Sequence, residues 1–173
     1  MFAPVLSAHA SAPTTAESVQ PDLYLTPGAA WDAMYEDCSR AQHSICFEQY
    51  IIANDETGLR FLQLFTRKAQ AGIKVQLVLD SIGSHDVEGS AALDALRNAG
   101  GEVIIFNPKQ IFHLLFPATW LPRNHAKTLI VDSSIAYVGS VCLASYMRNW
   151  HDVHLRLSGP IVKSIVDDFT QLW

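Results

Sequence analysis

The sequence predicts a layered α/β domain in which a central mixed β-sheet is covered by helices on both faces. The chain has 173 residues, which is enough for one domain with a sizeable hydrophobic core and a tight fit for two. Hydrophobic residues make up 49% of the chain and charged residues 17%, which excludes a wholly disordered, collagen-like or coiled-coil protein. Segments of helical periodicity alternate with short, β-branched apolar segments, as is typical of α/β sheets.

The first 20 residues differ from the rest of the chain. They are rich in Ala, Ser, Pro and Thr, contain no Lys or Arg, and show no sustained period. We therefore expect a flexible leader over residues 1–20 and a single domain over residues 21–173. A secretory signal would need a basic start and a longer apolar run, so secretion is not expected. No charge-free apolar run reaches the length of a membrane span, so any membrane contact is expected to be peripheral.

The first predicted unit is a helix followed by a strand. A helix is expected from Gly28 because apolar residues recur at i, i+3, i+4 and i+7, namely Trp31, Met34, Tyr35 and Cys38. Residues 44–52, SICFEQYII, are dense in aromatic and β-branched residues and predict a strand. Residues 54–58 form a turn that offers N-caps to a second helix, which ends at Gly72.

The same alternation continues through two more strands. Residues 73–80, IKVQLVLD, predict a buried strand, and residues 102–106, EVIIF, predict another. Between them, residues 91–96 form a short helix that Gly100 and Gly101 close. Strands separated by helices of this length imply a parallel or mixed sheet.

Residues 107–123, NPKQIFHLLFPATWLPR, interrupt the pattern with prolines and bulky apolar residues and without capping signals. Two interpretations stay open for them. The segment is either a buried irregular loop or, around residues 111–121, an apolar rim beside a site for an apolar ligand.

The last third of the chain predicts three strands and a helix. The strands are expected at residues 126–132, 135–139 and 151–157, with a hairpin turn at Ser133 and Ser134. Gly159 and Pro160 open a final amphipathic helix, because proline fits the first helical position.

Cysteine count and charge exclude several classes of site. Cys38, Cys46 and Cys142 are an odd number without CxxC spacing, which predicts reduced, buried thiols and no zinc site. The net charge of −5 disfavours a protein that coats nucleic acid. Residues 1–102 carry −7 and residues 103–173 carry +2, so the C-terminal part is the half that favours an anionic ligand.

Residues 124–140, NHAKTLIVDSSIAYVGS, contain the residues that predict chemistry. On an extended segment His125 and Lys127 share one face, and Asp132 points to the other. A neutral imidazole beside a cation suits phosphate chemistry, because the ring can attack phosphorus while Lys127 holds the non-bridging oxygens. Ser140 can add a hydroxyl donor.

These residues match the spacing HxKxxxxD(x6)GS, with which the chain resembles the phospholipase D superfamily. The resemblance extends over residues 28–173 and is closest to the N-terminal lobe of bacterial cardiolipin synthases. The matching blocks are SICFEQYII, AGIKVQLVLDSIGS, RNHAKTLIVD and WHDVHLRLSGPIV. The resemblance implies a layered α/β/α lobe with one catalytic motif.

The resemblance also implies roles for individual residues. The candidate catalytic set is His125, Lys127, Asp132, Ser140 and Asp152, and the candidate substrate-binding set is Lys127, Gly139 and Ser140. In the family one histidine becomes phosphorylated and the histidine of a second lobe acts as acid and base. His125 would take one of these roles, Lys127 would clamp the phosphate, and Asp152 would orient the histidine. The motif aspartate, Asp132, is usually structural in the family.

One feature departs from the family pattern. Cys142 stands where the family often has asparagine, so the subfamily tolerates the change or the lobe is a poor catalyst. For Cys142 we favour the role of a small buried packing residue over that of a replacement nucleophile, because a free cysteine needs an activating environment to be reactive. The other histidines of the domain are expected to be satisfied or solvated and not metal ligands, namely His43, His85, His113, His151 and His154.

The resemblance implies a phosphatidyltransferase or phospholipase D that acts on phospholipid without a metal or cofactor at the cytoplasmic face of a membrane. A dimeric endonuclease and a non-catalytic lipid-binding lobe are the alternatives, and a nucleic-acid partner is not expected. The sequence contains one His-x-Lys copy, so the second histidine would come from a homodimer or from a second lobe.

Overall fold

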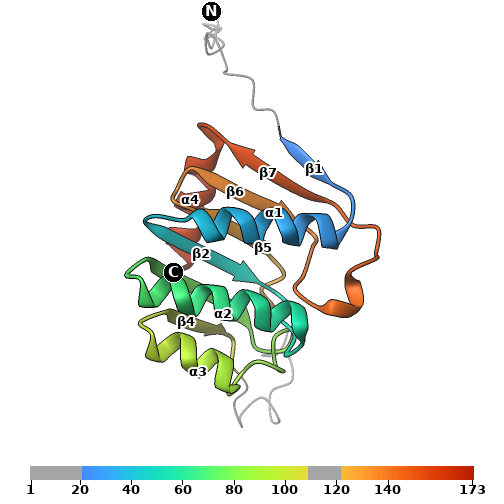
Figure 1. Ribbon diagram of the computed structural model, residues 1–173. Helices are drawn as coiled ribbons and strands as arrows, with labels where there is room; N and C mark the ends of the chain where they lie inside the picture. The colour runs from blue at the N-terminus through green and yellow to red at the C-terminus, as the bar shows by residue number, and fades with distance from the viewer. Residues whose placement is uncertain (1–20, 109–121) are drawn as a thin grey trace, which may run out of the picture.

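A computed structural model describes residues 21–108 and 122–173 of the chain. Its described part forms one seven-stranded mixed sheet with the order β1-β7-β6-β5-β2-β3-β4 (Figure 1). The strands are β1 (Asp22–Tyr24), β2 (Ser44–Gln49), β3 (Lys74–Asp80), β4 (Glu102–Phe106), β5 (Lys127–Val131), β6 (Ile135–Gly139) and β7 (His154–Ser158). The helices are α1 (Pro27–Arg40), α2 (Glu56–Gln70), α3 (Ala91–Asn98), the 3₁₀ turn η3 (Ser145–Met147) and α4 (Ile161–Leu172).

The fold has three layers, as the sequence predicts. Helices α1, α2 and α3 lie on the face of the sheet toward the viewer in Figure 1, and α4 lies behind it. The main core packs between the sheet and α1–α3, with Trp31, Phe47, Phe61 and Phe65 among its largest fully buried side chains. A second cluster, in which Val162 and Phe169 of α4 pack on Val78, Ile130 and Ala136, joins α4 to the other face.

Strand direction brings several strand ends to one end of the sheet. β2, β3 and β4 are parallel, whereas β5 runs antiparallel to β2, β6 to β5, and β7 to β6. The last residues of β2, β3 and β6 therefore lie at the same end as the first residues of β5 and β7. We call this the site end of the sheet.

Side-chain caps fix the starts of two helices, α2 and α3. The carboxylate of Asp55 accepts hydrogen bonds from the N–H groups of Thr57 and Gly58 at the start of α2. The hydroxyl of Ser90 accepts one from the N–H of Leu93 at the start of α3. Each cap satisfies backbone donors that the first helical turn leaves without a partner.

Several boundaries differ from the sequence prediction. β2 ends at Gln49 and not at residue 52, because the backbone N–H and carbonyl of Tyr50 bond to side chains and not to a neighbouring strand. β7 starts at His154 and not at residue 151, and the hairpin turn centres on Asp132 and Ser133, both at a φ of 52°. β1 and η3 were not predicted, because each has only three residues.

The leader at residues 1–20 and most of the apolar segment at 107–123 lie outside the described residues.

Candidate active site

The site end of the sheet collects most of the predicted site residues. Lys127 begins β5, Gly139 ends β6 with Ser140 directly after it, and Asp152 lies two residues before β7. Thr128 pairs with Val138 between β5 and β6, and continuing this register places Ser140 beside Ala126, one strand spacing of about 5 Å away. Residues that are far apart in the sequence thus meet in one place.

His125 and Lys127 are neighbours at this end, joined through the backbone and through an aromatic ring. The ammonium of Lys127 donates a hydrogen bond of 2.7 Å to the carbonyl oxygen of His125. The ring of Tyr50, the first residue after β2, has its centroid 4.4 Å from that of the His125 imidazole and 5.0 Å from Lys127 Nζ. His125 is exposed, so its ring is open to a ligand.

Lys127 carries its charge in a buried position, with only 7% of the residue exposed. Burial lowers the pKa of Lys127, and the nearby Cys142 and Asp152 partly offset this effect. A cation with little water around it attracts an anion more strongly than an exposed one, because the local dielectric constant is low. This end of the sheet is therefore suited to a phosphate group.

Ser140 and Asp152 form a second pair beside the first. The hydroxyl of Ser140 donates to the carboxylate of Asp152 and accepts from the N–H of Val153. Among the hydrogen bonds of the described residues, none joins Asp152 to the His125 ring, so the expected orienting contact is absent in this structure. Together with Leu25, His151 and Val153, the pair lines a hollow of about 320 Å³.

Asp132 does not belong to this site. It follows the last residue of β5, roughly 16 Å along the strand from Lys127. Its carboxylate accepts hydrogen bonds from the backbone N–H groups of Gln42, His43 and Ser44 at 2.7–2.8 Å. Burial favours the neutral acid, but the three backbone bonds outweigh it and lower the pKa of Asp132. Its carboxylate therefore lies apart from the other candidate residues and anchors the segment that leads into β2.

Gly139 lets β6 and β7 approach closely at the site. A Cβ atom at this position would lie 2.3 Å from the carbonyl oxygen of Val153 and 2.6 Å from Nδ1 of His154. Only glycine avoids these clashes without a shift of the β7 backbone. The residue therefore allows Ser140 and Asp152 to meet.

We expect Gly139→Ala to lower the free energy of unfolding by about 2 kcal/mol, because an added methyl group overpacks this contact. Urea unfolding followed by circular dichroism measures the change. Gly28→Ala is the matched control: its Cβ would meet only ordinary contacts of 3.6 Å or more, so little loss is expected. Equal midpoints for Gly139→Ala and the wild type would contradict the steric argument.

His154 is a buried histidine without a polar partner, contrary to the expectation that such histidines are satisfied or solvated. It is 1% exposed, and neither ring nitrogen has a hydrogen-bond partner within the described residues. Its ring stacks on Tyr137 at a centroid distance of 6.2 Å. Burial lowers the pKa of His154 to about 4, against a smaller opposing effect of Asp152.

This burial predicts a loss of stability in mild acid. Above pH 6.5 the imidazole is neutral in both the folded and the unfolded chain. Below pH 6.5 the unfolded chain binds a proton at His154, whereas the folded chain binds it only near pH 4. Stability should fall by about 3 kcal/mol as the pH drops through this window. Urea unfolding midpoints between pH 7.5 and 4.5 measure this fall in stability. The fall should be smaller in His154→Leu, and it should be unchanged in the control His43→Leu, because His43 is exposed. Parallel curves for all three proteins would exclude His154 as the cause.

Asp80 anchors the segment that delivers His125, a role that the sequence did not reveal. This fully buried carboxylate at the end of β3 accepts hydrogen bonds from the N–H groups of Ile82, Gly83 and Asn124 at 2.9–3.1 Å. Arg123 Nη1 lies 3.4 Å from it. The available signal was an aspartate as the last residue of a buried strand, directly before Ser-Ile-Gly.

Asn124 ties the same segment to β2. Its side-chain amide donates a 2.7 Å hydrogen bond to Glu48, and its side-chain oxygen accepts from the N–H of Ala126. The backbone on each side of His125 is therefore held, by Asp80 and Asn124 before it and by β5 after it.

Cys142 is buried, with 4% of the residue exposed. Burial raises the pKa of its thiol, although nearby Lys127 opposes this. A thiol that stays protonated is a poor nucleophile. These surroundings favour the interpretation of Cys142 as a small buried packing residue.

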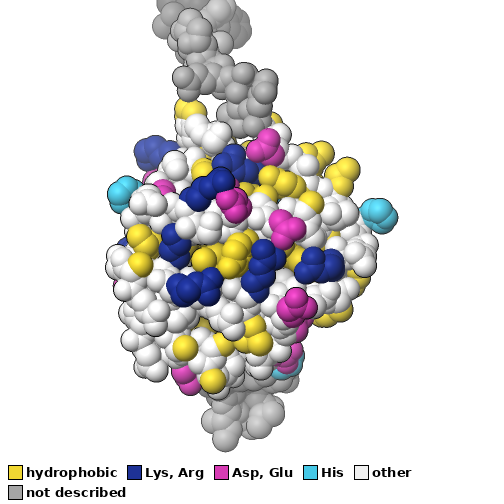
Figure 2. All heavy atoms as spheres, in the orientation of Figure 1, with side chains coloured by type: hydrophobic (Ala, Val, Ile, Leu, Met, Phe, Trp, Pro, Cys, Tyr) yellow, Lys and Arg dark blue, Asp and Glu magenta, His cyan; other side chains and the backbone are white. Residues whose placement is uncertain are grey.

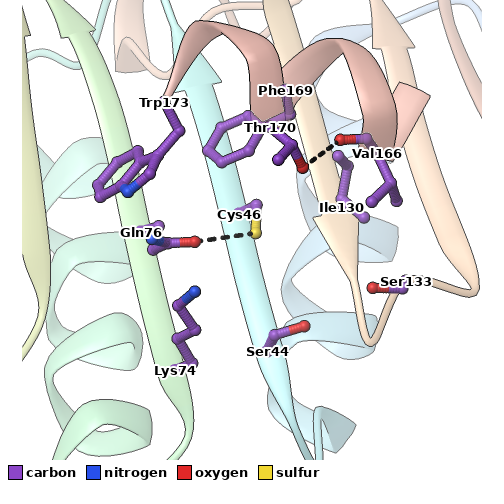
Figure 3. A pocket seen from close by; sticks show the side chains of 10 residues that line it. All are labelled: Ser44, Cys46, Lys74, Gln76, Ile130, Ser133, Val166, Phe169, Thr170 and Trp173. Carbon is purple, nitrogen blue, oxygen red and sulfur yellow. Dashed lines mark hydrogen bonds between the residues drawn. The ribbon is translucent and has the colours of Figure 1, made fainter. Parts of the chain in front are cut away.

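A separate hollow of about 230 Å³ lies between α4 and the sheet (Figure 3). Its lining residues are Ser44, Cys46, Lys74, Gln76, Ile130, Ser133, Val166, Phe169, Thr170 and Trp173. Ser44, Lys74 and Ser133 lie at the opposite end of the strands from Lys127. This hollow therefore contains none of the residues of the candidate site.

Basic side chains gather across the face that carries α1 and α2, with acidic side chains among them (Figure 2). Arg60 pairs with Asp32 at 3.1 Å, and Arg40 pairs with Glu36. The pairs neutralise part of the positive charge, so this face differs from the continuous basic grooves that bind nucleic-acid backbones. In residues 21–108 and 122–173, no helix is long and apolar enough to cross a membrane.

A family model described as "Cardiolipin synthase, PLD-like domain" matches residues 34–173. A cardiolipin synthase of Clostridium perfringens strain 13 is 30% identical over 159 residues, which cover 88% of this chain and 33% of the relative. One from Geobacillus thermodenitrificans is 30% identical over 148 residues, covering 82% of this chain and 29% of the relative. The chain thus spans about a third of the length of the curated relatives it matches.

Two solved structures share the fold. Nuc from Salmonella typhimurium, described as a phospholipase D family member, has a TM-score of 0.63 at 16% identity and covers 88% of this chain and 93% of its own. NucT from Helicobacter pylori has a TM-score of 0.68 at 16% identity, with 89% and 95% covered. At this identity the likeness shows the fold alone.

Proposed function

Because this chain belongs to the family of the phospholipase D-like domain of cardiolipin synthase, we propose that it is a catalytic lobe of a phosphatidyltransferase that acts on phospholipids. The observation that carries the proposal is the meeting of an exposed imidazole, His125, with a buried ammonium, Lys127, at the site end of the sheet. A nucleophile open to substrate beside a fixed cation is the arrangement that attack on a phosphodiester requires.

The reaction proceeds in two displacements. A ring nitrogen of His125 attacks phosphorus, a nitrogen–phosphorus bond forms, and the bond to the leaving alcohol breaks. A histidine of a second lobe protonates that alcohol as it leaves. The same histidine then takes the proton of an incoming hydroxyl, which attacks phosphorus and frees His125. A lipid or glycerol hydroxyl gives transfer, and water gives hydrolysis.

The surrounding residues assist through charge and hydrogen bonds. Lys127 holds the non-bridging oxygens of the phosphate, on which charge shifts in the transition state. Ser140 lies one strand away and adds a hydroxyl on the phosphate side. Asp152 holds the Ser140 hydroxyl and lies near enough to Lys127 to act on its charge.

The site needs a partner, because the mechanism uses two histidines and the sequence has one His-x-Lys motif. The second motif comes from another copy of this chain or from a second lobe. Mass measurement in solution distinguishes the two: an active homodimer supports the first source, and an inactive monomer that a second lobe activates supports the other.

Exposed apolar side chains beside the site support a lipid substrate. Leu25 and Val153 line the hollow next to Ser140 and are 57% and 49% exposed. The exposed rings of Tyr146 and Trp150 lie shortly before Val153 in the sequence and contact each other edge to face at a centroid distance of 5.7 Å. Aromatic and aliphatic groups of this kind suit the boundary between lipid and water. With the family resemblance, they support peripheral attachment at the cytoplasmic face of a membrane.

The test offers phosphatidylglycerol vesicles and single-stranded DNA to the protein in parallel assays. We expect release of glycerol with formation of cardiolipin or phosphatidic acid, and no DNA fragments. DNA cleavage without lipid turnover would replace this function with that of a nuclease. No turnover and no phosphorylated histidine, in a dimer or with a second lobe, would leave a non-catalytic lipid-binding lobe.

A further inference from the structure

We propose that Tyr50 is a positioning residue, whose ring holds the His125 imidazole and the Lys127 ammonium in the geometry that phosphoryl transfer needs. The catalytic part of this inference rests on the proposed function, whereas the contacts on which it stands do not. Neither the motif nor the family match singles out this residue.

The ring of Tyr50 is the contact that orients His125. His125 precedes the first residue of β5, so the strand ladder does not hold it. Its imidazole makes no side-chain hydrogen bond to any of the described residues, and its ring contact is with Tyr50, at 4.4 Å and an angle of 54° between the rings. The orientation of the nucleophile therefore depends on a neighbour from a different strand.

The same ring lies under the charge of Lys127. Nζ is 5.0 Å from the ring centroid, within the range in which the negative face of an aromatic ring attracts a cation. Burial lowers the pKa of Lys127, whereas the negative face of an aromatic ring favours the charged form of an ammonium. One side chain thus supports both catalytic groups, through packing on one and through electrostatics on the other.

Tyr50 is itself held firmly. Its N–H donates to the side-chain oxygen of Gln49 at 3.0 Å, and its carbonyl accepts from the hydroxyl of Ser84 at 2.9 Å. Gly83 packs directly behind it, since a Cβ there would lie 2.1 Å from the Tyr50 carbonyl oxygen and 2.9 Å from ring atom Cδ2. Asp80 in turn holds the N–H of Gly83. A rigid support therefore reaches from the end of β3 to the His125 ring.

Two variants of Tyr50 separate the ring from its hydroxyl. Tyr50→Phe keeps the ring, and Tyr50→Leu removes it while keeping an apolar side chain of similar reach. Tyr35→Leu is the matched control, because Tyr35 on α1 also has a cation over its ring, Arg60 at 4.1 Å, but contacts neither His125 nor Lys127 in the described structure. The full chain is used, in the assembly that shows turnover.

Two measurements are made on each variant. The first is an NMR titration of the Lys127 side chain, which needs no activity. The second is the steady-state rate on phosphatidylglycerol vesicles as a function of pH. For Tyr50→Leu we expect the Lys127 midpoint to fall by about 0.5–1 pH unit. We also expect kcat to fall about 10- to 100-fold with KM within threefold, and the basic limb of the pH profile to move to lower pH. Tyr50→Phe and Tyr35→Leu should resemble the wild type.

The outcomes separate this inference from the proposed function. If His125→Ala abolishes turnover while Tyr50→Leu leaves kcat and the Lys127 midpoint unchanged, Tyr50 has no positioning role. If Tyr50→Phe is as impaired as Tyr50→Leu, the hydroxyl and not the ring matters, which also overturns the proposal. If His125→Ala keeps full turnover, the proposed function fails, and a lowered Lys127 midpoint in Tyr50→Leu would still show the contact with the ring.

Discussion

Replacing His125 by alanine should reduce lipid turnover by about 10⁴-fold or more, because the variant lacks the imidazole that forms the bond to phosphorus in the proposed mechanism. The fold should survive, since the side chain is exposed and lies outside β5. Release of labelled glycerol from phosphatidylglycerol measures the rate, and urea unfolding measures the stability, which should change by less than about 0.5 kcal/mol.

The control for this variant is His43→Ala, which removes another exposed histidine, just before β2 at the far end of the sheet. It should keep the wild-type rate. A phosphorylated histidine should be trapped in the wild-type protein and not in His125→Ala. Turnover by His125→Ala within tenfold of wild type would place the nucleophile elsewhere.

Asp80→Ala should have the largest effect on stability, with a loss of about 4 kcal/mol in the free energy of unfolding. The substitution removes the acceptor for three backbone N–H groups and leaves the Arg123 guanidinium, 20% exposed, without its buried partner. It also frees both the segment that carries His125 and the loop behind Tyr50. We therefore expect turnover to be lost together with stability.

Chemical unfolding at neutral pH measures this loss. Asp86→Ala serves as the control, because that carboxylate is half-exposed and pairs with exposed His85; it should cost less than about 0.5 kcal/mol. Asp80→Asn keeps the shape and one acceptor oxygen, so it should lie between the wild type and Asp80→Ala. A stable but inactive Asp80→Ala protein would mean that the carboxylate orders the site without stabilising the fold.

Local patterns were sufficient to predict most of the fold. The i, i+3, i+4, i+7 spacing around Trp31 reports which side of α1 is buried, and the starts of α2 and α3 carry a capping side chain whose partner is two or three residues away. Asp55 and Ser90 cap their helices in this way. Such signals are readable because both partners lie in the same short stretch of sequence.

Features that depend on contacts between distant segments were not predictable. β1 has three residues and exists because it pairs with β7, 130 to 134 positions later. The later start of β7 follows from backbone N–H groups that turn instead to Leu25 and Ser140. Within the described part of the chain the ring nitrogens of His154 have no hydrogen-bond partner, which depends on how distant segments pack around the ring.

The sequence by itself determined the layered α/β class, most helix and strand positions and the His125–Lys127 pair, since all of these depend on spacing along a few residues. Only the tertiary structure decided that Tyr50 lies against both members of the pair, that Asp152 bonds to Ser140, that Asp80 anchors the segment before His125, and that Asp132 binds the backbone before β2. The physical reason is the antiparallel arrangement of β5 with β2 and β6, which brings together residues about 75 positions apart.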